Sequence, residues 1–214
     1  MKSRIVLLGP PASGKGTQAQ RIAARFGIPA VSTGHLLRDE AAGSTGLGRR
    51  AASFTSKGQL APDDLVLAVL KKWLGNGRES FVFDGFPRTL EQATILDPLL
   101  LEANIPLHVT LFLDCDLPTI QHRVLGRLTC SSCKSIFNIG LHIQSEHETC
   151  PKCAGKLERR ADDTLEILEQ RMTQYARKTE PLIAFYREKG ILCKINASQE
   201  SDAVFAEIEK ELLQ

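Results

Sequence analysis

The sequence contains no long hydrophobic run. Its first apolar stretch, residues 5–8, is four residues long and ends at Gly-Pro-Pro, which is too short for the hydrophobic core of an export signal. No stretch approaches the roughly 20 consecutive apolar residues that a membrane-spanning helix needs. We therefore expect no membrane association and a cytoplasmic location.

An excess of charge of one sign is also missing. The 27 Lys and Arg residues and the 25 Asp and Glu residues leave a formal net charge of +2. Proteins that bind nucleic acid usually carry a strongly basic face, so the composition gives no support for a nucleic-acid partner. Internal repeats and low-complexity tracts are absent as well. The 214 residues suffice for one sizeable core, or for a core with small inserted lobes.

Five short apolar runs rich in branched residues are present instead. They are RIVLLG, PAVS, SFVFDG, HVTLFLD and ILCKIN, and each is followed by a stretch with the spacing of a helix. Short buried strands that alternate with helices indicate a parallel sheet covered on both faces. The expected fold class is α/β, with a doubly wound sheet of five parallel strands.

Helix signals occur at three positions. Ser32 is expected to cap a helix over TGHLLRDEAA, and Pro62 to open one over PDDLVLAVLKKWL. Pro181 lies inside the long amphipathic stretch DDTLEILEQRMTQYARKTEPLIAFYREKG. Because proline has no N–H for the helical hydrogen bond, it predicts a kink or a break there.

Two segments do not fit the alternation of strands and helices. Residues 32–61 predict small helices between the second and third strands, and residues 128–160 are polar, cysteine-bearing and strand-like. We expect a core domain of residues 1–31, 62–127 and 161–214 with these two insertions. Insertions at the carboxyl ends of such strands lie over the ligand crevice and are candidates for moving lids.

The segment GPPASGKGT, directly after the first predicted strand, fits a P-loop. Four residues separate Gly9 from Gly14, and Lys15 follows. The alternative is an ordinary turn in which glycine only supplies unusual backbone angles, but the spacing favours phosphate binding. Small residues let several N–H groups approach the phosphates, and the helix that starts near Lys15 adds the positive end of its dipole. Gly16 displaces the usual hydroxyl to Thr17, which argues against magnesium ligation through that hydroxyl.

Four of the six cysteines form two C-x-x-C pairs that are separated by 16 residues. Two such knuckles bring four thiolates together in the preferred environment of structural zinc. The expected ligands are Cys130, Cys133, Cys150 and Cys153.

The cysteines also allow other interpretations. Disulfides are disfavoured in a reducing compartment, and a redox pair would not explain the second C-x-x-C. Iron uses the same ligands, and His142 or His147 could replace one of them. With all four positions closed by sulfur, the metal should be structural, holding together a lobe too small for its own core.

At FVFDGFPRT a resemblance becomes specific. Together with GPPASGKGTQ, STGHLLR, RVLGR and RRADD, it resembles the adenylate kinase family, in the long, zinc-containing bacterial form. The motifs occur in order over essentially the whole chain. The resemblance implies reversible phosphoryl transfer from ATP to AMP giving two ADP, Mg²⁺ with the ATP, structural Zn²⁺ and a monomer. It implies that residues 32–61 bind the monophosphate and that residues 128–160 form the lid.

The resemblance also assigns residues. It implies that Gln92 contacts the adenine of AMP, and that Asp162 and Asp163 place the arginines. The implied ATP-binding residues are Pro10, Pro11, Ala12, Ser13, Gly14, Lys15, Gly16, Thr17, Arg123, Arg127, Phe137 and Gln199. The implied AMP-binding residues are Thr33, Gly34, Arg38, Gln59, Leu60, Ala61, Gly85, Arg88, Gln92, Arg160 and Arg171. The implied catalytic residues are Lys15, Arg88, Arg127, Arg160, Arg171 and Asp84.

The chemistry of phosphoryl transfer fits this set of residues. Such a reaction needs in-line positioning and neutralisation of spread negative charge, with little need for a strong base. Arginine suits this because its planar fork binds two oxygens at once. Asp84, at the end of an apolar strand, is placed to orient magnesium or its waters. Lids that close over both nucleotides would keep water from hydrolysing ATP.

The sequence departs from the family pattern at a few positions. His35 stands where the family usually has Asp, and Lys134 stands where glycine is common after the first knuckle. The nearest rival function is another nucleoside monophosphate kinase, for UMP/CMP or with GTP as donor; Thr89 and Gln92 favour AMP. A rival of another class is a zinc-ribbon adaptor without catalysis, against which the arginine set and the near-neutral charge argue.

Overall fold

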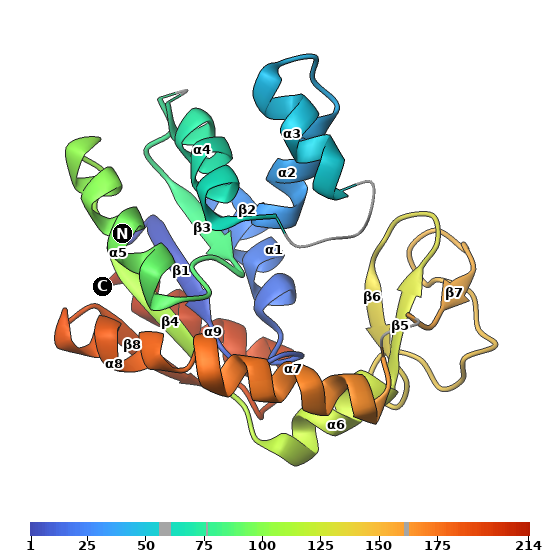
Figure 1. Cartoon of the computed structure of the whole chain (residues 1–214). Coiled ribbons are helices and arrows are strands. Elements are labelled where there is room, and N and C mark those ends of the chain that lie inside the picture. The colour runs from blue at the N-terminus through green and yellow to red at the C-terminus, as the bar shows by residue number, and fades with distance from the viewer. Residues whose placement is uncertain (56–60, 76, 161–162) are drawn as a thin grey trace.

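A five-stranded parallel sheet forms the centre of the molecule (Figure 1). The computed structural model describes residues 1–55, 61–75, 77–160 and 163–214. The strand order is β2-β3-β1-β4-β8, and every pair is parallel. The five predicted runs are all confirmed as strands of this sheet, with the bounds β1 Arg4–Leu8, β2 Ala30–Ser32, β3 Phe81–Asp84, β4 Val109–Asp114 and β8 Leu192–Asn196.

Helices cover both faces of the sheet, as predicted. Alternate residues of β1 point to opposite sides, so Ile5 and Leu7 belong to one buried cluster and Val6 and Leu8 to another. The first cluster is completed by α1 Lys15–Phe26, α6 Leu117–Leu125, α7 Leu165–Lys178 and α9 Ser201–Leu213. The second is completed by α2 Thr33–Ala41, α3 Gly46–Thr55, α4 Asp63–Leu74, α5 Leu90–Glu102 and α8 Pro181–Glu188.

The predicted helix signals are also confirmed. The Ser32 hydroxyl accepts a hydrogen bond from the backbone N–H of His35 at 3.2 Å and so caps α2. Pro62 is the N-cap residue of α4. The long amphipathic stretch breaks into α7 and α8, and Pro181 is the first residue of α8, where its missing N–H is harmless.

Two insertions interrupt the strand and helix alternation. Helices α2 and α3 follow β2 and pack closely at Gly48, where a Cβ would lie 2.5 Å from the Gly43 carbonyl oxygen. The second insertion, between α6 and α7, is a small antiparallel sheet with the order β6-β5-β7. Figure 1 shows this lobe standing apart from the central sheet, at the ends of α6 and α7. Its strands are β5 Arg127–Cys130, β6 Ile136–Asn138 and β7 Leu157–Glu158.

Among the described residues, none of the helices combines the length and the apolar character that crossing a membrane requires.

Candidate functional site

The loop between β1 and α1 has the geometry of a phosphate cradle. Its backbone takes positive φ at Gly9 (148°), Ala12 (59°) and Gly14 (96°), and a Cβ on Gly9 would lie 2.7 Å from the Leu113 carbonyl oxygen. The loop therefore lies directly against the end of β4. Helix α1 starts at Lys15 with no side chain capping its first turn, so its N–H groups remain available to an anion.

Lys15 lies over this loop in a desolvated position. Its ammonium group donates to the carbonyl oxygens of Gly9 and Pro10, both at 2.8 Å. Loss of water lowers the pKa of Lys15 from 10.5 to about 8, although the nearby charge of Asp84 raises it. Backbone carbonyls are weaker partners for a cation than phosphate oxygens are. Lys15 is therefore held in place for a ligand of higher charge.

Asp84 ends strand β3 beside Lys15. Burial raises the pKa of its carboxyl group, while the charges of Lys15 and Arg88 lower it. A Cβ at position 16 would lie 3.2 Å from the Asp84 Oδ2 atom. Gly16 therefore keeps the space beside the carboxylate open, whereas Thr17 is exposed on α1.

Ser13 adds an unused donor to the loop. The residue is 2% exposed, and its hydroxyl has no hydrogen-bond partner within the part of the chain that the structure describes. A buried hydroxyl without a partner is unfavourable unless a ligand or water satisfies it. A phosphate oxygen fits this requirement.

Arg123 contacts two other residues that the sequence assigns to ATP, Ser13 and Gln199. Its guanidinium group donates to the carbonyl oxygens of Ser13 at 3.4 Å and of Gln199 at 3.1 Å. The Cys115 sulfur is a third acceptor, at 3.5 Å. The helix α6 that carries Arg123 is thus tied to the P-loop and to the segment after β8.

The loop after β3 holds the second set of predicted residues. Gly85 has a φ of 76°, and its carbonyl oxygen accepts from Arg88 Nε at 2.7 Å. Gln92 is 7% exposed, and its side-chain oxygen accepts from the Arg88 backbone N–H at 2.7 Å. The Thr89 hydroxyl caps α5 by accepting from the Gln92 N–H. Arg88 and Gln92, which the sequence predicts as AMP ligands, are therefore adjacent in space.

The other predicted AMP-binding residues lie on the first insertion and its edge. Thr33, Gly34 and Arg38 are on α2, and Arg38 passes close to Gly34. Ala61 immediately precedes the cap of α4 and is partly buried. Gln59 and Leu60 lie outside the described residues.

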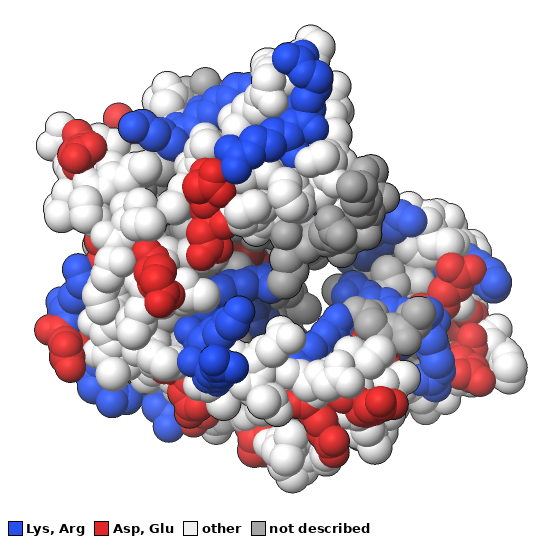
Figure 2. All heavy atoms as spheres, in the orientation of Figure 1, with Lys and Arg blue, Asp and Glu red and all other residues white. Residues whose placement is uncertain are grey.

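Two of the predicted arginines are engaged at the base of the lobe. Arg127 binds the Asp163 carboxylate through two nitrogens, with Nε at 2.7 Å from Oδ2, and the Asp163 side chain is 1% exposed. Arg160 donates to the Thr129 hydroxyl at 3.1 Å. Arg171 is on α7, and Asp162 lies outside the described residues. Figure 2 shows Lys and Arg side chains gathered around a recess in this face of the molecule.

Phe137 lies in the core of the lobe and not on its surface. It is 7% exposed and packs with Leu128 and Leu157 in the lobe's own buried cluster. Its neighbour Ile136 points outward, with 45% exposure. The Phe137 side chain therefore faces the interior of the lobe.

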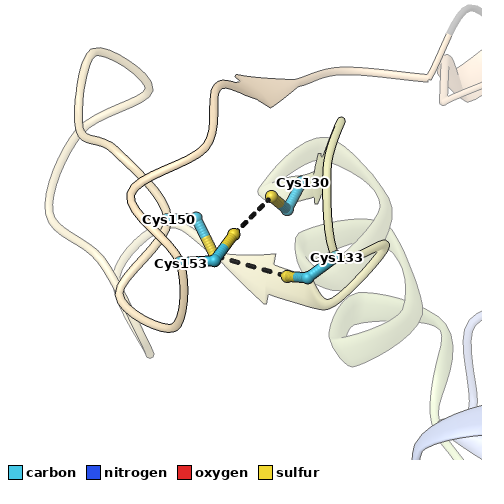
Figure 3. A group of neighbouring side chains, drawn as sticks. All are labelled: Cys130, Cys133, Cys150 and Cys153. Atoms are coloured by element: carbon cyan, nitrogen blue, oxygen red, sulfur yellow. Dashed lines mark hydrogen bonds between the residues drawn. The ribbon is translucent and has the colours of Figure 1, made fainter.

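The four cysteines of the lobe converge, as Figure 3 shows. The Sγ atoms of Cys130 and Cys153 are 3.5 Å apart, those of Cys133 and Cys150 are 3.6 Å apart, and all four lie within 4.8 Å of one another. A tetrahedron with Zn–S bonds of about 2.3 Å has edges of about 3.8 Å. The cluster therefore fits a four-thiolate metal centre.

The backbone of the two knuckles supports the same arrangement. Lys134 and Ala154 follow the second cysteine of each pair and take φ values of 59° and 57°. A Cβ on Gly155 would lie 2.9 Å from the Cys130 sulfur. Hydrogen bonds with the Ser135 side chain and backbone lower the pKa of Cys133 to about 6, whereas the pKa of Cys153 is raised to about 11, because the lowering effect of the Gly155 backbone hydrogen bond is outweighed by contacts with the Cys130 and Cys133 sulfurs. A bound cation would stabilise all four sulfurs as thiolates.

The site has a glycine-rich loop between a buried strand and a helix, and a lysine lies over this loop. Arginines lie in the loop after β3 and at the base of the lobe. These features define a P-loop phosphotransferase that acts on nucleotides. Comparison with known proteins narrows this class. The adenylate kinase family model matches residues 7–191.

Individual relatives agree with the family match. The chain is 41% identical to an adenylate kinase of Thermodesulfovibrio yellowstonii over 207 residues, which cover 96% of each chain. It is 40% identical to an adenylate kinase of Chlamydia pneumoniae, with 97% of this chain and 96% of the relative covered. It is 38% identical to one of Archaeoglobus fulgidus over 96% of this chain and 95% of the relative. The chain belongs to the adenylate kinase family.

Some polar contacts of the site were not predicted from the sequence. Gln92 Nε2 donates to the Asp63 carboxylate at 2.6 Å, and the Thr179 hydroxyl donates to the Arg88 carbonyl oxygen at 2.9 Å. The third such contact joins the Arg123 guanidinium group to the Cys115 sulfur. The only signal for Asp63 was its place in the first turn of a predicted helix, which is common for acidic residues.

Proposed function

We propose that this chain catalyses the reversible transfer of a phosphoryl group from ATP to AMP, giving two ADP. The observation that carries the proposal is the convergence of Lys15, Asp84 and Arg88 at the ends of the adjacent strands β1 and β3, where their charges act on one another. Ligands of open α/β sheets bind at this end of the strands. Lys15 belongs to the P-loop after β1, and Arg88 belongs to the loop after the adjacent strand β3. Lys15 is therefore placed for the phosphates of ATP and Arg88 for the phosphate of AMP.

For ATP, the proposed cradle is residues 10–17. The free N–H groups at the start of α1 and the Ser13 hydroxyl donate to phosphate oxygens, and Lys15 exchanges its two carbonyl partners for phosphate. Arg123 lies beside the base, and Arg127 reaches the phosphates. Its present partner, the buried Asp163 carboxylate, fixes the direction of the Arg127 guanidinium group.

For AMP, the proposed site is formed by α2, the segment that leads into α4, and the loop after β3. Arg38 and Arg88 bind the monophosphate, and the Gln92 amide binds the adenine edge. Support comes from the backbone N–H of Arg88, which holds the Gln92 side chain in a buried position. Thr33 and Gly85 complete the walls of the site.

The chemical step requires no strong base. A phosphate oxygen of AMP attacks the γ-phosphorus of ATP, the bond from that phosphorus to the bridging oxygen breaks, and ADP leaves on the opposite side. Lys15, Arg88, Arg127, Arg160 and Arg171 neutralise the charge that spreads over the transferred group. Preorganised cations of this kind are the largest source of rate acceleration in such sites.

Two metals complete the proposal. Zn²⁺ is held by the four cysteines of the lobe, because four converging sulfurs match its preferred ligands. All four positions are occupied by protein ligands, so this metal is structural. Mg²⁺ bound with ATP would neutralise phosphate charge, and the Asp84 carboxylate, with open space beside Gly16, would orient it or its waters.

The two insertions are proposed to be moving covers, residues 32–61 over AMP and residues 128–160 over ATP. Adenylate kinase lids are a known case of closure that keeps water away from the reaction. The rest of the chain is the core domain. We further propose that the protein acts as a monomer in the cytoplasm.

The deciding experiment follows ADP formation from ATP and AMP, with zinc and iron measured on the same sample. We expect turnover in both directions and one zinc per chain. The same assay with UMP, CMP and GMP as acceptors, and with GTP as donor, tests the rival substrate classes. Failure to interconvert these nucleotides in either direction would overturn the proposal.

A further inference from the structure

Asp63 contacts Gln92 beside the proposed base site, and the proposed function gives this contact no role. It is the first residue of α4, and its Oδ1 atom accepts a hydrogen bond from Gln92 Nε2 at 2.6 Å. On the other side of the same amide, Gln92 Oε1 accepts from the Arg88 backbone N–H at 2.7 Å. The Gln92 amide is thus held from two sides by groups on different elements.

The chemistry of these two partners permits one orientation of the amide. A backbone N–H can only donate, so it must face the amide oxygen, and an ionised carboxylate can only accept, so it must face the amide nitrogen. Turning the amide over would set nitrogen against N–H and oxygen against carboxylate. Both contacts would become repulsive, and Gln92 is too buried, at 7% exposure, for water to compensate.

The oxygen and the nitrogen of the Gln92 amide can each make one more hydrogen bond. The nitrogen has a second N–H, and the oxygen has a second lone pair. A held amide therefore offers one donor and one acceptor in a fixed order. Adenine presents an N6–H donor and an N1 acceptor, which this order matches. Hypoxanthine and guanine present an O6 acceptor and an N1–H donor, which require the opposite order.

We propose that Asp63 is a positioning residue that determines base specificity: by holding the Gln92 amide in one orientation, it makes the monophosphate site accept 6-aminopurines and reject 6-oxopurines. This inference rests on the proposed function, because it takes Gln92 to be the residue that contacts the base. Asp63 itself does not touch the ligand.

A neighbouring residue separates this role from a general effect of charge. Asp64 occupies the same first turn of α4 and contributes the same favourable interaction with the helix dipole. Its carboxylate pairs with Arg50, at 2.5 Å, and not with Gln92. Asp64→Asn is therefore a matched control for the loss of one negative charge at this helix start.

The test compares Asp63→Asn, Asp64→Asn, Gln92→Ala and the double variant Asp63→Asn/Gln92→Ala. Dissociation constants for AMP and for inosine monophosphate are measured by calorimetry, together with the thermal midpoint. In Asp63→Asn the new side-chain amide can donate as well as accept, so residue 63 no longer selects one orientation of Gln92, and only the Arg88 backbone N–H still favours it. We expect the preference for AMP over inosine monophosphate to narrow by about tenfold in Asp63→Asn, the scale of one hydrogen bond to a charged group.

The control and double variants make the outcome unambiguous. Asp64→Asn should leave the preference unchanged, and the double variant should narrow it no further than Gln92→Ala alone. If Asp63→Asn weakens both ligands equally, the residue only supports the helix and the inference is wrong. If Gln92→Ala leaves the preference unchanged, the assignment of the base site fails, and the inference fails with it.

Discussion

The sheet-centred body and the cysteine lobe differ in what holds them together. Among the described residues, the two clusters on the faces of the sheet contain 20 and 18 buried apolar residues, whereas the cluster in the lobe contains six. Two of those six are the cysteines Cys130 and Cys150. The body is stabilised by apolar burial, whereas the lobe has little apolar burial and instead brings four cysteine sulfurs together.

This difference separates chemistry from stability. Lys15, which is proposed to act on the phosphates, is a desolvated cation in the body and contributes little to its core. The lobe has the reverse character, since its proposed metal centre would be closed to substrate and would stabilise a lobe that has only a small apolar core of its own. Substitutions in the two regions should therefore change different measurements.

The largest expected effect is that of Lys15→Ala on turnover. Removing the ammonium group takes away the charge nearest to the outer phosphates, and we expect kcat to fall by about 10³-fold. The thermal midpoint should not fall, because the Lys15 side chain is desolvated and, within the described part of the chain, donates to backbone carbonyls and not to a carboxylate. ADP formation and thermal unfolding measure the two effects. Loss of turnover in the exposed Lys71→Ala control would contradict a specific role.

Cys130→Ala should act in the opposite sense. It removes one ligand of the proposed metal, and the loss of about 3 kcal/mol expected from such a contact corresponds to about 10 °C in the thermal midpoint for a chain of this size. Turnover at low temperature should be largely retained. Cys193→Ala, outside the cluster, is the control. An equal loss of turnover at low temperature would remove the distinction between the two regions.

A pH profile sharpens the comparison within the body. Desolvation lowers the pKa of Lys15 to about 8, so in the free enzyme its charge is lost as the pH rises through that value. Because kcat/KM reports the free enzyme, kcat/KM for ATP should fall about tenfold per pH unit above that pKa. In Lys15→Arg the fall in kcat/KM should begin at a higher pH, because guanidinium stays charged. A profile that is flat to pH values well above the pKa would contradict this state of Lys15.

The smallest expected effect lies in the lobe. Lys134 takes a φ of 59°, a left-handed conformation that is unfavourable for a residue with a Cβ. Lys134→Gly should stabilise the lobe by roughly 0.5–1 kcal/mol, since the relief of strain exceeds the entropy that glycine loses. Chemical unfolding of the metal-loaded protein measures the change. A decrease in stability would show that the Lys134 side chain, which donates to the Ser131 carbonyl, outweighs the strain.

Local signals in the sequence predicted most of the fold. Each strand of the central sheet is an apolar run, and Ser32, Pro62 and Pro181 act through their own backbone or the next turn, so their effects are visible without tertiary structure. The cysteine cluster was also predictable, because the spacing within each pair sets the geometry of a knuckle.

Contacts between distant segments were not predictable in this way. The Asp63 carboxylate meets Gln92 because α4 packs beside α5, and nothing in either segment alone specifies that bond. Phe137 illustrates the same limit at short range. Its strand is three residues long, so alternation alone could not decide which side chain enters the lobe's core and which faces outward.

The strand order β2-β3-β1-β4-β8 has a consequence for how this architecture can vary. One insertion follows β2 at the sheet edge, and the other lies beyond β4 on the opposite side of the P-loop strand. Neither passes between hydrogen-bonded strands, so lengthening or shortening either one leaves the register of the sheet unchanged. The two proposed covers are therefore free to diverge independently, with the P-loop as the fixed point between them.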